Sequence, residues 1–121
     1  MREPRDQGDT RVRVSSGNVF ADLGLDEPEE EHAKATLAMR IIRLIRERGW
    51  SQAQAAAALG IDQPKISKIV RLRLDPFSTE RLLHYLTLLG QDVEIVVRPK
   101  PTGEPRATLR VAVLDDAPAA D

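Results

Sequence analysis

The sequence predicts a mainly α-helical bundle of four to five helices, with a β-strand or hairpin near its C-terminal end. Apolar residues recur at helical spacing through most of residues 29–90, and the period changes to strict alternation at residues 92–98. Aromatic residues make up only 3% of the chain, so aliphatic side chains must fill the core. A length of 121 residues is that of one domain with tails.

The centre of the chain contains two short helical patterns separated by a glycine turn. Ser51 is a good N-cap residue, and Gln54 lies three positions further on, which is the spacing of a capping box. An alanine-rich run at residues 53–58 allows a neighbouring helix to approach closely. Gly60 can adopt the left-handed conformation that ends a helix. These features predict a first short helix that ends at the glycine.

A second helix is expected to begin after Asp62, which is another N-cap residue. Pro64 falls in its first turn, where a missing N–H costs little. One face carries apolar residues at the spacing of a buried stripe: Ile66, Ile69 and Val70. Two short helices joined by a tight turn that contains glycine, the second with a polar outer face, form a helix-turn-helix layout.

The polar face of the second helix has the chemistry of a DNA-binding surface. Its residues are Gln63, Lys65, Ser67 and Lys68. Glutamine can make two hydrogen bonds to adenine in the major groove, and lysine can reach O6 and N7 of guanine, so these four are the candidate base contacts. Ser51 and Gln52 are candidate phosphate contacts, because the N-terminus of a helix attracts anions.

The stretch SQAQAAAALGIDQPKISKIVRLRL resembles the Xre-type, phage-repressor-like helix-turn-helix. Together with GNVFADLGL upstream and GQDVEIVVRP downstream, it is similar to small antitoxin repressors of Hig-type toxin–antitoxin pairs. The resemblance covers roughly residues 16–101 and implies a homodimeric repressor that neutralises a toxin and represses its own operon. It also implies phosphate contacts by Arg71 and Arg73, for which simple exposure to solvent is the alternative. Pro64 stands where many phage repressors carry a second glutamine, so the operator sequence cannot be transferred.

The net charge of −1 conceals an uneven distribution. Residues 1–31 contain 4 Lys or Arg and 9 Asp or Glu, and residues 91–121 contain 4 and 6. Residues 32–90 contain 10 Lys or Arg and only 4 Asp or Glu. A basic helical body between acidic ends favours a nucleic-acid partner, although the charge alone is equally compatible with a solvated surface.

The chain divides into five expected segments. They are a flexible arm at 1–16, an apolar segment at 17–28, the helix-turn-helix domain at 29–90, a dimerisation element at 91–114 and a disordered tail at 115–121. Residues 11–14 alternate and offer a strand as the alternative to a flexible arm. The apolar segment either folds back on its own domain or docks on a toxin through Val19, Phe20, Leu23 and Leu25.

The dimerisation element contains an alternating strand. Its inward residues are Val93, Ile95 and Val97. A second alternating run at residues 109–113 can pair with it, or the same strand of a second copy can cover its open edge.

Several classes of function are not expected. The chain has no cysteine, and His32 and His84 are isolated and best explained as ordinary surface residues, so we predict no metal site, no cofactor and no enzyme activity. No apolar run reaches the length of a membrane span, and no signal peptide is apparent, which predicts a cytoplasmic protein. Two alternatives to an antitoxin remain: a regulator without a toxin, and an interaction module whose helix-turn-helix is only a scaffold.

Overall fold

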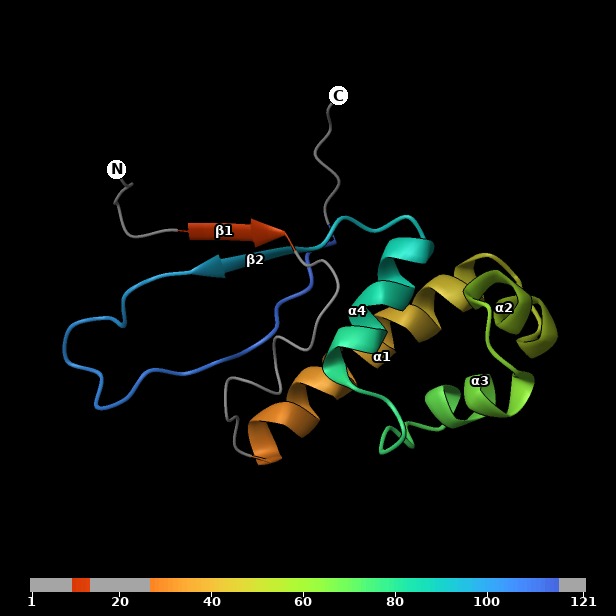
Figure 1. The fold of residues 1–121 in the computed structure, drawn as a ribbon, viewed down its shortest axis with the longest axis horizontal. Helices are drawn as coiled ribbons and strands as arrows, with labels where there is room; N and C mark the ends of the chain where they lie inside the picture. The colour runs from red at the N-terminus through yellow and green to blue at the C-terminus, as the bar shows by residue number, and fades with distance from the viewer. Residues whose placement is uncertain (1–9, 14–26, 116–121) are drawn as a thin grey trace, which may run out of the picture.

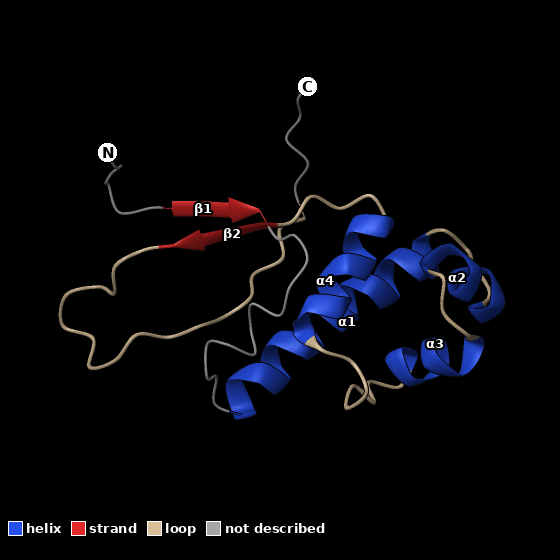
Figure 2. Cartoon of the chain, in the orientation of Figure 1, coloured by secondary structure: helices blue, strands red, loops and turns tan. Residues whose placement is uncertain are grey.

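The computed structural model describes residues 10–13 and 27–115. Within these ranges, four helices form a bundle and two short strands form a ribbon beside it (Figures 1 and 2). The ribbon lies at the opposite end of the molecule from α2 and α3 (Figure 1). The structure therefore has the mainly helical architecture that the sequence predicted.

Helix α1 (Glu27–Glu47) is the scaffold of the bundle, because α4 (Thr79–Leu88) and α3 (Gln63–Val70) both contact it. Its buried apolar stripe consists of Ala33, Leu37, Ala38, Ile41, Ile42, Leu44 and Ile45. Helix α4 adds Leu82, Leu83, Tyr85 and Leu86 to the same core. The 3.6-residue period seen in the sequence thus corresponds to the faces that the two helices bury against each other.

The ends of α1 and α4 are joined by one arginine. The guanidinium of Arg48 donates a hydrogen bond to the carbonyl oxygen of Leu89 at 2.6 Å, and it lies 5.1 Å from the centre of the Trp50 ring. Trp50 itself is half-buried and packs against the core.

Helix α2 (Gln52–Leu59) packs against α3 through small side chains. Ala55 and Ala56 are buried, whereas Ala57 and Ala58 face solvent. A methyl group at each buried position lets the backbones of the two helices approach closely. The alanine-rich run therefore serves packing on one face of α2 only.

Residues 109–113, one of the two partners expected for the strand near the C-terminal end, do not pair with it. Strand β2 (Glu94–Val97) pairs antiparallel with β1 (Thr10–Arg13), with Thr10 opposite Val97 and Arg13 opposite Glu94. Residues 10–13 thus belong to a strand, although a flexible arm was favoured over residues 1–16. Residues 109–113 form no strand, and the backbone N–H of Leu109 donates instead to a side chain, the Glu29 carboxylate, at 3.3 Å.

The C-terminal segment, residues 106–115, returns to α1 after a long loop. Arg106 lies 3.8 Å from Glu29, and Val111 packs against the core. The segment is therefore attached to the bundle at several points along α1.

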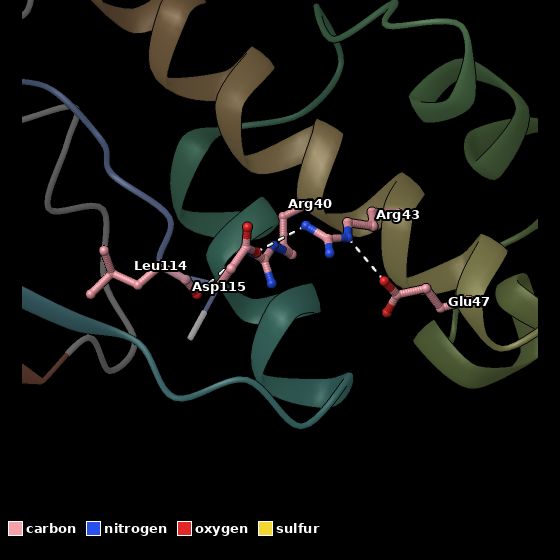
Figure 3. Close-up of polar contacts among 5 residues, drawn as sticks. All are labelled: Arg40, Arg43, Glu47, Leu114 and Asp115. Carbon is pink, nitrogen blue, oxygen red and sulfur yellow. Dashed lines mark hydrogen bonds and ion pairs between the residues drawn. The ribbon is translucent and has the colours of Figure 1, made fainter. Parts of the chain in front are cut away.

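The last of these attachments is an ionic cluster (Figure 3). Arg40 bonds to the Asp115 carboxylate and to the carbonyl oxygen of Leu114, and Arg43 lies 2.9 Å from both Asp115 and Glu47. Asp115 was expected to begin a disordered tail, but Arg40 and Arg43 bind it to α1.

We predict that this attachment weakens in acid. The hydrogen bond from Arg43, together with the charges of Arg43 and Arg40, holds the pKa of Asp115 below its ordinary value. A carboxyl group whose pKa is lower when folded stabilises the folded arrangement above its unfolded pKa, and that contribution is lost as the pH falls through the folded pKa. Amide NMR shifts of Leu114 should therefore titrate below about pH 4. Asp115→Asn should abolish this titration; an unchanged titration in that variant would contradict the assignment.

A second prediction concerns the packing of α2. Ala55→Leu should destabilise the fold by about 1–3 kcal/mol, because extra methylene groups have no space at a position with 0% exposure. Ala57→Leu, on the exposed face of the same helix, should change the stability by no more than about 0.5 kcal/mol. Urea unfolding of both variants checks this, and equal effects at the two positions would contradict it.

Candidate nucleic-acid interface

The N-terminus of α2 is closed by the expected capping box. The Ser51 hydroxyl accepts a hydrogen bond from the Gln54 backbone N–H at 3.1 Å, and the Gln54 side-chain oxygen accepts one from the Ser51 N–H at 2.8 Å. Ser51 is exposed and Gln52 is half-buried. The amides at the start of a helix lack acceptors within it, so this end can bind an anion such as a phosphate.

The turn between α2 and α3 is formed by Gly60, whose φ is +72°. Its N–H bonds to the carbonyl oxygen of Ala57 at 3.3 Å, and the next N–H, that of Ile61, bonds to Ala56 at 3.1 Å. Space for a β-carbon is open at this position, so only the left-handed backbone conformation favours glycine here. This turn sets the direction in which α3 leaves α2.

Helix α3 begins at an Asp62 cap, whose carboxylate accepts the N–H of Lys65 at 3.1 Å. Ile66 and Ile69 are both 0% exposed, so the apolar stripe predicted for this helix is buried. These two side chains fix the rotation of α3 about its axis. Gln63, Lys65 and Lys68 consequently point to solvent, while Ser67 is half-buried.

The loop after α3 places two more cations next to this face. Arg71 and Arg73 are exposed, and the only hydrogen bond of their side chains in the described residues runs from Arg71 Nε to the carbonyl oxygen of Ser67, at 3.4 Å. In the part of the chain that the structure describes, no carboxylate forms an ion pair with Lys65, Lys68, Arg71 or Arg73. These four positive charges are therefore available to an external polyanion.

One residue that supports this loop was missed in the sequence. Lys34 of α1 is buried; its ammonium lies 3.5 Å from the carbonyl oxygen of Leu74 and 3.8 Å from the Glu30 carboxylate. It thereby ties the loop that follows α3 to the scaffold helix. The sequence did contain a signal for the burial of Lys34, because position 34 lies on the same face of the helix as Ala38 and Ile41.

The other candidate residues lie elsewhere. Val93 and Ile95 are half-buried, whereas Val97 is exposed. The proposed toxin-docking residues, Val19, Phe20, Leu23 and Leu25, lie outside the described residues.

Two further classes of feature are not seen in the part of the chain that the structure describes. No helix there is both long and apolar enough to cross a membrane. No group of three or more His, Asp or Glu side chains over these residues is arranged as metal ligands.

Comparison with known proteins agrees with this geometry. A family described as a helix-turn-helix domain matches residues 19–98, which include all of α1–α4 and β2. A solved structure described provisionally as an XRE family transcriptional regulator is 44% identical, with a TM-score of 0.67 over 75% of this chain and 100% of that one. No curated protein matches significantly. The chain belongs to the Xre-type helix-turn-helix family of transcription regulators.

Proposed function

We propose that this regulator is a homodimeric repressor that inserts α3 into the major groove of an operator. The observation that supports the proposal best is the exposed surface of α3, where Gln63, Lys65 and Lys68 are open to solvent. The helix is anchored by Ile66 and Ile69, which are buried. A rigid helix with amide and ammonium groups on its outer face matches the donor and acceptor pattern of base edges. Ser67, less exposed, would contact bases only on close approach.

Phosphate contacts would flank this helix. Ser51 and Gln52 lie at the N-terminus of α2, and Arg71 and Arg73 follow the C-terminus of α3. Contacts on both sides of the inserted helix would fix its register on the duplex. Because each neutralised phosphate releases counterions, binding should weaken steeply as salt rises.

The ribbon supports the proposal of a dimer. Neither outer edge of β1–β2 is paired with another strand in the described residues, and a two-stranded ribbon is marginal by itself. Val97 is 55% exposed on β2. Pairing with the ribbon of a second copy would cover these groups and relate two α3 helices by a two-fold axis. Half-sites in the operator would then lie about 34 Å apart.

A role as an antitoxin is the second candidate function, and it rests on the sequence resemblance alone. It adds a protein partner that binds Val19, Phe20, Leu23 and Leu25. A regulator without a toxin is equally compatible with the geometry of the helix-turn-helix. The two candidates differ in what residues 17–28 bind, and both use α3 in the same way.

The DNA-binding proposal predicts two different responses to substitution. Gln63→Ala should cost about 1–3 kcal/mol on the preferred site and relax the preference at one base pair only. Arg73→Ala should weaken all sequences alike and reduce the salt slope by about 1. Fluorescence anisotropy on the upstream DNA of the gene, with sedimentation to establish a dimer, measures both effects.

Arg110→Ala is the matched control, because Arg110 is also exposed but lies in the C-terminal segment, outside the helix-turn-helix. It should leave the affinity unchanged. A Gln63→Ala variant with wild-type affinity and site preference would show that α3 does not contact bases.

The antitoxin role predicts that Phe20→Ser prevents co-purification with the small protein encoded beside the gene. Removing residues 1–27 is a poorer test, because it also deletes β1. A point substitution leaves the ribbon intact, so DNA binding should stay at the wild-type level. Asp22→Asn serves as a polar control in the same segment. If the wild-type chain does not co-purify with its neighbour, the regulator acts without a toxin.

A further inference from the structure

All four helices in the described residues end with the same backbone motif. In each, a residue with positive φ stands at the end of the helix, and its N–H and the next N–H bond back into the last turn. In α1, α2 and α4 this position is glycine: Gly49, Gly60 and Gly90, with φ of +66°, +72° and +85°. Three of the four motifs therefore contain glycine, the residue that adopts a positive φ without strain.

Helix α3 ends with the same motif but has no glycine in it. Its motif is complete, since Leu72 N–H bonds to the Ile69 carbonyl oxygen at 2.9 Å and Arg73 N–H bonds to that of Lys68 at 2.8 Å. The residue at the positive-φ position is Leu72, with φ of +60°. A β-carbon in this conformation crowds the backbone, so leucine destabilises a turn that glycine would form without strain.

Packing does little to offset this strain. The Leu72 side chain is 45% exposed, whereas Ile69 and Leu74 on either side in the sequence are buried. A large apolar side chain is thus displayed to solvent at a position where the fold itself favours glycine. An unfavourable conformation that leaves nearly half of a large apolar side chain exposed indicates a role outside the folded chain.

The neighbours of Leu72 indicate the partner. It stands between Arg71 and Arg73, two exposed cations without an ion-pair partner in the described residues, and directly after α3. A patch with positive charge on both sides of an apolar group complements the DNA backbone, in which apolar deoxyribose rings lie between phosphates.

We propose that Leu72 is a DNA-contacting residue, packed against a deoxyribose between the phosphates that Arg71 and Arg73 bind. The inference rests on the proposed function and extends it to a residue that hydrogen-bond chemistry alone does not identify. Because every nucleotide has this sugar, the contact adds affinity without sequence preference. Because leucine is uncharged, the contact leaves the salt dependence of binding unchanged.

Two substitutions separate the contact from the strain. Leu72→Ala removes the contact with DNA but keeps the β-carbon and therefore the backbone strain. Leu72→Gly removes both the contact and the strain. Each should weaken binding to all DNA sequences by about 5-fold, because DNA would bury the exposed half of the leucine side chain. Neither substitution should change the slope of affinity against salt concentration. Only Leu72→Gly should hold or raise the Tm, by up to about 5 °C.

Gly49→Leu is the matched control, because it introduces the same side chain at the same motif in α1, where a β-carbon meets nothing within 4 Å. It should lower the Tm and leave DNA affinity unchanged. Anisotropy, thermal unfolding and sedimentation of the four proteins complete the experiment.

Wild-type affinity in both Leu72 variants would overturn the inference while leaving the proposed function in place. A lower Tm in Leu72→Gly would overturn it in favour of an internal packing role. A change from dimer to monomer would overturn it in favour of a contact between copies. If the wild-type chain binds no DNA, the proposed function itself fails, and the Leu72 contact fails with it.

Discussion

The burial of Ile66 and Ile69 is the constraint on which the interface depends. Both side chains are fully enclosed, and each therefore fixes the face that α3 presents to solvent. Gln63, Lys65 and Lys68 lie outside this buried stripe of the same short helix and are exposed. A helix of two turns has little stability in isolation, so its geometry depends on this anchoring rather than on helix propensity.

Two groups of arginines in the described residues have different roles. Arg40, Arg43 and Arg48 are bound to carboxylates or carbonyl oxygens of the chain itself, and they join α1 to the C-terminal segment and to the end of α4. Arg71 and Arg73 are exposed beside α3. Formal charge in the sequence does not distinguish these groups, because the distinction depends on partners far away along the chain.

Local signals predicted the helices well. The caps at Ser51 and Asp62 and the glycine end of α2 arise from neighbouring residues, and each formed as expected. Contacts between distant segments were not predictable in the same way. The pairing of β1 with β2 and the attachment of Asp115 to Arg43 depend on where the bundle places each segment. Lys34 was overlooked because a lysine beside an apolar stripe is usually solvated.

The ribbon also has a consequence for the order of folding. Thr10 pairs with Val97, so closing β1 onto β2 encloses almost the whole helical region in one loop. Such a closure has a high entropic cost unless the intervening chain is already compact. The helix-turn-helix, built from contacts between neighbours in sequence, can therefore form first, and the ribbon closes on a finished bundle. Synthesis from the N-terminus delivers β1 early, but its partner strand emerges only after all four helices.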